Sequence, residues 1–234
     1  GPPVKAAIMQ PYFFPYIGYW QLIRAADVFV LYDDVAYIKG GWINRNRILE
    51  RGQAVYLTLE TRGASPNRKI NEVMAGDNAG RLIKTLRQNY AKAPCFAEAM
   101  PALEALLTDA EPNLARRLEN LIRGICARLG IDTPIRVSSR LGRDTTLDRD
   151  RSILDICARL NATSYINAIG GRALYAADVF AARGLDLRFL QPRPVEYGQF
   201  GQPFVPWLSI IDVMMFNPPE AIDAMLGEYD LVAG

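Results

Sequence analysis

The chain has 234 residues, of which 50% are hydrophobic and 22% are charged, so it is long enough to bury a core of its own. Lys and Arg number 27 against 25 Asp and Glu, and the net charge of +2 is too small for a general attraction to nucleic acid or anionic lipid. The chain has no histidine, which excludes Ser-His and Cys-His catalysis and zinc sites that use histidine.

The cysteines and the apolar segments indicate a cellular compartment. Cys95, Cys126 and Cys157 are too few for a disulfide framework and lack Cys-X-X-Cys spacing. No run of about 18 apolar residues and no apolar leader is present. These features predict a cytoplasmic protein with reduced thiols and no membrane span.

Two short apolar runs, at 4–9 and 26–32, are predicted strands, and the segment between them is long enough for a short helix. Strands that are apolar on both faces and separated by helix-length segments are typical of a parallel sheet covered by helices. A third strand is predicted at 54–59. Residues 3–75 are therefore expected to form an N-terminal α/β segment that carries the main motifs.

Helical spacing of apolar residues from 79 to 129 predicts a helical insert or subdomain at 76–130. Strands and helices then alternate again, so residues 131–234 are expected to complete the N-terminal domain. The predicted strands lie at 135–137, 164–167 and 185–190, and the predicted helices lie at 152–160, 172–183 and 218–226. Together the elements predict an α/β fold with a Rossmann-like parallel or mixed sheet flanked by helices.

The first candidate binding segment follows the first strand and opens the first helix. In a parallel sheet, ligands gather at the carboxyl ends of strands, where a helix start presents free N–H groups. A glycine there lets a ligand approach the backbone, and tyrosines supply stacking faces and hydroxyls. The alternative is that these rings only pack the helix against the sheet. The candidate residues are Gln10, Tyr12, Tyr16, Gly18 and Tyr19.

Asp33 and Asp34 directly follow the second predicted strand. A carboxylate at this place suits a metal ligand, a general base or an acceptor for ribose hydroxyls. Neighbouring side chains of an extended chain point to opposite sides, so at most one of the two is expected to face a given pocket. The alternative is a helix cap or a turn.

A polar segment at 39–48 is the third candidate, and its members are Lys39, Trp42, Asn44, Arg45, Asn46 and Arg47. If the segment is extended, its two arginines share one face and its two asparagines share the other. Guanidinium groups bind phosphate or carboxylate through paired hydrogen bonds. The alternative is a charged face in contact with solvent.

Two further segments lie in the C-terminal half. Asn167, Gly170 and Gly171 lie between a predicted strand and a predicted helix, where glycines form backbone cradles for anions. Residues 140–146 have mixed charge and are expected to form an exposed loop. The sequence shows no cluster that predicts a metal site.

Four of these segments resemble the WbqC-like family, bacterial proteins found with genes for O-antigen and other surface-sugar synthesis. The matching sequences are Met-Gln-Pro-Tyr-Phe-Phe-Pro-Tyr-Ile-Gly-Tyr at 9–19, Asp-Asp-Val at 33–35, Trp-Ile-Asn-Arg-Asn-Arg-Ile at 42–48 and Asn-Ala-Ile-Gly-Gly at 167–171. The resemblance implies a role near sugar modification, such as acyl or aminoacyl transfer to an amino sugar. Many members carry His in place of Met9, which implies a structural or peripheral role for this position.

Three functions remain open. The first is acyl or aminoacyl transfer to the amine of a small, nucleotide-linked substrate, with a thioester of coenzyme A or of a carrier protein as the donor. Asp33, Asp34 and Lys39 are then the catalytic candidates, and one aspartate is the base. The asparagines or the backbone near Gly18 would stabilise the oxyanion, and Arg45 and Arg47 would hold phosphate.

The second function is that of a nucleotide-dependent ligase or nucleotidyltransferase, in which an aspartate holds Mg²⁺ and the arginines hold the triphosphate. The arrangement around 16–19 resembles that of pantothenate-synthetase-like enzymes, although tyrosines replace both histidines of their His-X-Gly-His signature. The third is a non-catalytic partner protein in a biosynthetic assembly, which would use the aromatic residues near Trp207.

Overall fold

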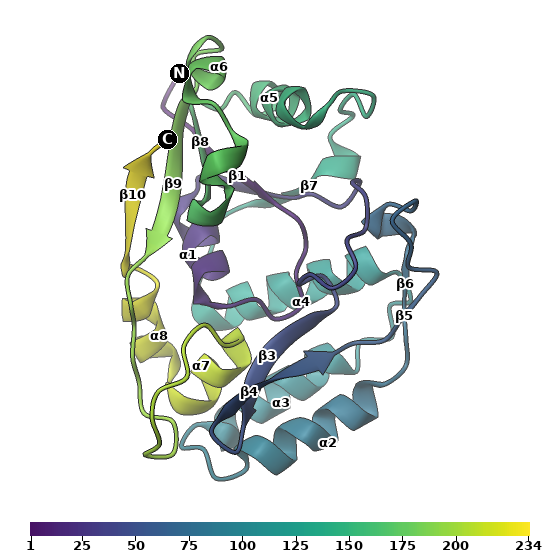
Figure 1. The fold of residues 1–234 in the computed structure, drawn as a ribbon, viewed down its shortest axis with the longest axis vertical. Coiled ribbons are helices and arrows are strands. Elements are labelled where there is room, and N and C mark those ends of the chain that lie inside the picture. The colour runs from purple at the N-terminus through teal and green to yellow at the C-terminus, as the bar shows by residue number, and fades with distance from the viewer.

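A six-stranded sheet forms the centre of the computed structural model, which describes residues 1–234 (Figure 1). Five strands are parallel and the edge strand β10 is antiparallel. The α/β fold with a Rossmann-like mixed sheet is therefore confirmed. In spatial order the strands are β10 (Tyr229–Ala233), β9 (Asp186–Pro192), β8 (Ser164–Ala168), β1 (Lys5–Met9), β2 (Val28–Leu31) and β7 (Ile135–Val137).

The order of the strands creates a reversal point in the middle of the sheet. The chain starts at β1 and moves outward through β2 to β7. It then returns to β8 on the other side of β1 and continues through β9 to β10. In open α/β sheets, ligands bind in the crevice outside the carboxyl ends of the strands that flank such a reversal. Here β1 and β8 are those strands.

Both faces of the sheet are covered, which explains why its strands are apolar without strict alternation. Ala7 belongs to a core of 47 buried residues on one face, whereas its neighbours Ala6 and Ile8 belong to a core of 12 on the other. Helix α1 (Ile17–Ala25) packs in the larger core. Helices α5 (Arg149–Arg159) and α6 (Ala177–Ala181) pack in the smaller one.

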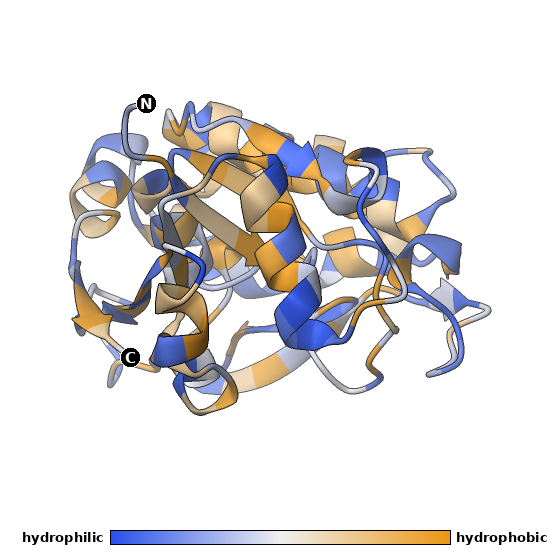
Figure 2. Cartoon of the chain, turned by 90° about the horizontal axis from the view of Figure 1, so that it is seen from above, coloured by the Kyte–Doolittle hydropathy of each residue, from blue (hydrophilic) through white to orange (hydrophobic).

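The middle of the chain forms three helices, as the apolar spacing predicts: α2 (Ala79–Tyr90), α3 (Phe96–Leu107) and α4 (Leu114–Leu129). Hydrophobic and hydrophilic residues alternate along the helices of Figure 2. Helix α4 is capped at its start by Asn113, whose side chain accepts a hydrogen bond from the N–H of Arg116, and at its end by Gly130 in a left-handed conformation. These helices share the larger core with α7 (Ile210–Phe216) and α8 (Pro219–Met225).

Strands β3 (Arg45–Glu50) and β4 (Gln53–Thr58) form an antiparallel hairpin outside the main sheet. Strand β4 was predicted, whereas β3 overlaps the end of the polar segment at 39–48. A second small pair contains β5 (Thr61–Arg62) and β6 (Met74–Ala75). The Tyr90 hydroxyl accepts a hydrogen bond from the Leu49 N–H, so α2 holds the hairpin in place.

The prediction of a single helix at 172–183 is wrong. A 3₁₀ turn at Ile169–Leu174 and the short α6 replace it, and Tyr175 between them has an extended backbone. The Tyr175 ring packs edge-on against Tyr165 and Phe180, with centroids 5.9 and 5.7 Å away. This aromatic packing outweighs helix propensity. No strand was predicted where the chain forms β10. None of the helices combines the length and apolar composition needed to cross a bilayer.

Candidate functional site

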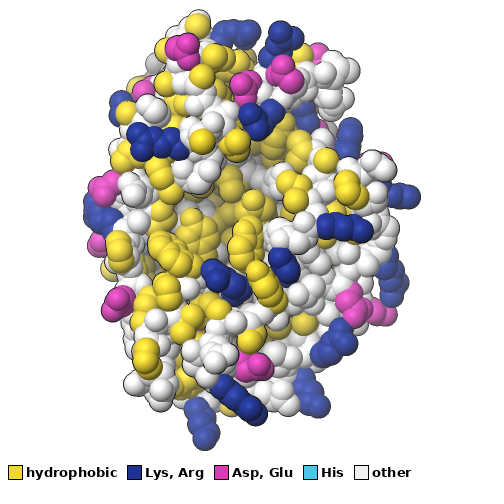
Figure 3. Space-filling view, viewed as in Figure 1, with side chains coloured by type: hydrophobic (Ala, Val, Ile, Leu, Met, Phe, Trp, Pro, Cys, Tyr) yellow, Lys and Arg dark blue, Asp and Glu magenta, His cyan; other side chains and the backbone are white.

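A cavity of about 850 Å³ lies at the carboxyl ends of β1, β2 and β8, and we call it the sheet-end cavity. The face seen in Figure 1 is hollowed in its middle, and hydrophobic side chains gather around the hollow (Figure 3). Eight of the predicted site residues line the cavity. They are Gln10, Tyr12, Tyr16, Asp34, Trp42, Asn167, Gly170 and Gly171.

The walls of the sheet-end cavity supply uncharged donors. Burial raises the pKa of Tyr12 and of Tyr16, so both phenols keep their protons at neutral pH. A Cβ atom at Gly171 would lie 2.9 Å from the Asn167 amide nitrogen, so glycine allows this amide to lie against the 3₁₀ turn after β8. Met9 also lines the cavity, so its position borders the site, and the structural or peripheral role expected for it stays a prediction.

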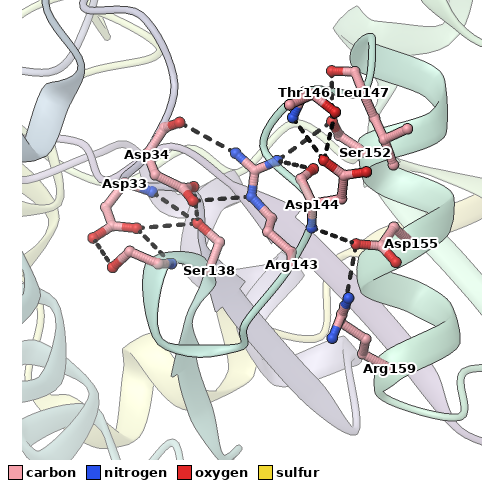
Figure 4. A network of polar contacts seen from close by, with 11 residues as sticks. Asp33, Asp34, Ser138, Arg143, Asp144, Thr146, Leu147, Ser152, Asp155 and Arg159 are labelled. Carbon is pink, nitrogen blue, oxygen red and sulfur yellow. Dashed lines mark hydrogen bonds and ion pairs between the residues drawn. The ribbon is translucent and has the colours of Figure 1, made fainter.

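The two adjacent aspartates line different cavities, in agreement with the alternation of an extended chain. Asp34 lines the sheet-end cavity, and Asp33 lines a separate cavity of about 420 Å³. Both are buried, with 7% and 6% of their surface exposed. The Ser138 hydroxyl, at the end of β7, lies within hydrogen-bond distance of a carboxylate oxygen of each (Figure 4).

Arg143 forms a buried ion pair with Asp34. Its Nε donates to Asp34 Oδ2 at 3.0 Å, and only 4% of the Arg143 side chain and 5% of the Asp34 side chain are exposed. Its Nη2 donates to the Asp34 carbonyl at 3.2 Å, and its guanidinium lies 5.0 Å from the centroid of the Tyr32 ring. The expectation of an exposed loop at 140–146 is therefore wrong for Arg143. The useful signal was its position just after a parallel strand.

The hydrogen bonds distinguish the two carboxylates. Asp33 accepts from the Ser139 N–H at 3.0 Å and from the Ser139 hydroxyl at 2.7 Å, in addition to its contact with Ser138. These bonds join the ends of β2 and β7. Asp34 accepts from Ser138 on one oxygen and from Arg143 on the other. Each oxygen has two acceptor sites, so each oxygen of Asp34 keeps one for a bound molecule.

Asn46 and Arg47, on β3, line a smaller cavity of about 330 Å³. Its walls also contain Tyr12, Tyr16, Trp42 and Trp207, and we call it the aromatic cavity. The first three of these residues line the sheet-end cavity as well, so the two cavities are neighbours.

Three polar residues of the predicted site line none of these three cavities. Lys39 is exposed to solvent. The Asn44 amide donates to the Leu59 carbonyl at 2.9 Å. Arg45 donates to the carbonyls of the two glycines before Trp42, and its guanidinium lies 4.0 Å from the centroid of the Tyr56 ring. Asn44 and Arg45 therefore stabilise the hairpin and the loop before it.

Two residues of the first helix also lie away from the cavities. Tyr19 is buried in the larger core, and its hydroxyl donates to the Gln10 carbonyl at 2.8 Å. A Cβ atom at Gly18 would overlap the ring of Tyr16. Gly18 thus makes room for a side chain that lines the cavities, and the expected close approach of a ligand to its backbone is not what this glycine accommodates.

Arg149 lines the sheet-end cavity without any indication from the sequence, and Trp207, which the sequence suggested only as part of a partner surface, lines the aromatic cavity. Arg149 is the first residue of α5, lines the sheet-end cavity and has its guanidinium 5.6 Å from the centroid of the Tyr175 ring. Trp207 comes from the chain between β9 and α7. No group of three or more Asp, Glu, Cys or His side chains is placed so as to hold a metal ion.

Comparison with known proteins gives a family and one relative. The sequence model of a family described as the WbqC-like protein family matches residues 10–224. An uncharacterized protein of Mycobacterium tuberculosis, Rv1507c, is 29% identical over 225 residues, which cover 94% of this chain and 96% of that protein. No solved structure matches the chain significantly.

Proposed function

Because the chain belongs to the WbqC-like protein family, we propose that it is a biosynthetic enzyme that transfers an acyl or aminoacyl group to an amine of a sugar or other small metabolite. The observation that supports this proposal is the carboxylate of Asp34, which lines the sheet-end cavity and is held there by Arg143 and Ser138. A fixed carboxylate beside a cavity at the carboxyl ends of parallel strands suits a general base.

The proposed step joins an amine to a thioester. The amine nitrogen attacks the thioester carbonyl carbon, a C–N bond forms, and the C–S bond then breaks with its electron pair on sulfur. Asp34 takes the proton that the nitrogen loses, and this proton then passes to the leaving thiolate. The free acceptor sites on the Asp34 oxygens allow the first proton transfer without loss of the bond from Arg143.

Other groups around the sheet-end cavity fit the remaining needs of the reaction. The protonated hydroxyls of Tyr12 and Tyr16 and the backbone N–H groups near Gly171 are donors for a developing oxyanion. Arg149, whose side chain is 55% exposed, is a cation for a phosphate of the substrate or the donor. Arg149 lines the sheet-end cavity and Arg45 does not, so Arg149 takes the phosphate-binding role that the sequence suggested for Arg45.

A nucleotide-dependent ligase is the second candidate, and the strand order favours it. The reversal between β1 and β8 is the place where Rossmann-type sheets bind nucleotides. This reaction would use ATP and release ADP, AMP or pyrophosphate, whereas acyl transfer from a thioester releases a free thiol.

The test incubates the protein with nucleotide-linked amino sugars and with acyl and aminoacyl thioesters of coenzyme A and of a carrier protein. Mass spectrometry detects the amide, and a thiol reagent detects the released thiol. The proposal predicts both products, and no ATP consumption. Product that forms only with ATP would favour the ligase. The absence of any product, together with the absence of thermal stabilisation by every compound, would favour a non-catalytic partner protein.

A further inference from the structure

The aromatic cavity carries two hydrogen-bond donors that the protein does not use. Asn46 is only 5% exposed, and its Oδ1 accepts a hydrogen bond from the Arg47 N–H at 2.9 Å, which fixes the orientation of the amide. Its Nδ2 donates to no protein group, although the residue lines the cavity. The Arg47 Nε is buried without a partner, whereas its Nη2 donates to the Trp207 carbonyl at 3.4 Å. A buried donor without a partner is costly, and with the free Asn46 Nδ2 in the same wall it points to a ligand with acceptors.

The other lining residues of the aromatic cavity are mostly flat and apolar. Tyr16 and Trp207 lie edge to face with their centroids 6.0 Å apart, and Trp42 lies 5.7 Å from the Arg47 guanidinium. Trp207 is 50% exposed, and its backbone has the uncommon φ of 62°. Such rings bury the apolar face of a ligand ring. The positive charge of Arg47 disfavours a cationic ligand.

These observations favour a sugar ring over a nucleobase. Asn46 Oδ1 already accepts one hydrogen bond and a guanidinium has no acceptor, so this wall offers mainly donors. The hydrogen-bonding edge of a nucleobase presents N–H donors beside its acceptors, and these would face donors here. Sugar hydroxyls rotate and accept at every position. We infer that the aromatic cavity is a subsite for the sugar ring of the substrate, with Asn46 and Arg47 donating to its hydroxyl oxygens.

This inference rests on the proposed function only where it places the amine of the substrate in the sheet-end cavity. The two cavities share Tyr12, Tyr16 and Trp42. A sugar ring in the aromatic cavity can therefore extend a substituent into the sheet-end cavity, where Asp34 is the acceptor. The positive Arg47 and the negative Asp34 then orient an amino sugar with its amine toward Asp34.

Tryptophan fluorescence tests the inference directly. The chain has three tryptophans, of which Trp20 is fully buried and the other two line the aromatic cavity. The protein is titrated with glucosamine, N-acetylglucosamine and methyl glucoside, and separately with uridine and adenosine. A saturable change with at least one sugar is expected, and it should be absent in Trp42→Phe combined with Trp207→Phe.

Asn46→Asp is the sharpest variant, because it keeps the acceptor for the Arg47 N–H and replaces the free donor with an acceptor. It should weaken sugar binding by about tenfold or more. Trp207→Ala is a second test in case Asn46→Asp misfolds, because Trp207 is exposed. It should also weaken sugar binding, measured by calorimetry. Nucleosides that bind while sugars do not, no saturable change with any sugar, or equal affinity in Asn46→Asp would overturn the inference.

Asp34→Asn separates the two proposals. It should bind methyl glucoside, which has no amine, as wild type does, because Asp34 does not line the aromatic cavity. Sugar binding without any transfer activity in the wild type would leave the subsite standing and remove the proposed function. Transfer to a non-sugar amine without sugar binding would leave the proposed function standing and remove the subsite.

Discussion

Two buried aspartates, Asp34 and Asp212, show how the same side chain serves two purposes in this molecule. Asp34 pairs with the guanidinium of Arg143 and lines the sheet-end cavity. Asp212 is fully buried in α7 and accepts hydrogen bonds only from uncharged groups, the hydroxyls of Tyr90 and Tyr197 at 2.7 and 2.6 Å and the Gln199 amide at 2.8 Å.

The partners and the surroundings explain the difference. The bonds of Asp212 join α2, α7 and the chain between β9 and α7, and burial raises the pKa of its carboxyl. It therefore stabilises the scaffold that carries Trp207. Asp34 has a charged partner and a cavity beside it, which keep a carboxylate available to a ligand. Burial alone does not distinguish the two carboxylates; the charged partner and the adjacent cavity make Asp34 the candidate for the proposed base.

The largest stability effect is expected at the Asp34 pair. Arg143→Met should lower the free energy of unfolding by about 3–5 kcal/mol, because it leaves a buried carboxylate without its cation. The double variant with Asp34→Asn should recover most of this loss. Urea denaturation measures both. A single variant that unfolds within about 1 kcal/mol of wild type would show that Asp34 is solvated, contrary to this account.

A smaller loss is expected at the Asp212 cluster. Tyr197→Phe removes one donor to a fully buried carboxyl and should cost about 1–3 kcal/mol in unfolding free energy. Tyr56→Phe is the matched control, since Tyr56 is exposed and its hydroxyl makes no hydrogen bond to the protein. Equal denaturation midpoints for the two variants would contradict a supporting role for the cluster.

The smallest predicted effect is a pH dependence that comes from Asp212. Its pKa is raised by burial in the folded state, so the folded chain binds this proton more tightly than the unfolded chain. Its contribution to stability is therefore greatest below the unfolded pKa of about 3.9 and falls as the pH rises toward the folded pKa. The stability of wild type minus that of Asp212→Asn should decrease over this range in denaturation measured from about pH 4 upward. A difference that increases would contradict the raised pKa.

The sequence could predict the parts of the fold that depend on local pattern. The runs that became β1 and β2 are apolar on both faces because both faces are buried, and the motif residues lie at the strand ends where α/β sheets bind ligands. The alternation of Asp33 and Asp34 also predicted that they would face different ways.

The remaining parts of the site depend on contacts between distant segments. Arg143 reaches Asp34 across 109 residues, and its own segment has the composition of an exposed loop. Trp207 is brought to Tyr16 by the packing of the tail. The break at Tyr175 arises from the packing of its ring on Tyr165 and Phe180. The contacts of Trp207 and Tyr175 have no local signal in the chain, and the only signal for Arg143 is its place after a predicted strand.

The most direct test of the account compares Asp34→Asn with Asp33→Asn in the transfer reaction. The two substitutions are chemically identical and adjacent, and the two side chains line different cavities. We predict that kcat/KM falls by about 10²–10⁴-fold in Asp34→Asn, as expected for loss of a general base, and by less than about tenfold in Asp33→Asn. Equal losses in the two variants, or an active Asp34→Asn enzyme, would contradict the claim that Asp34 is the catalytic base of the sheet-end cavity.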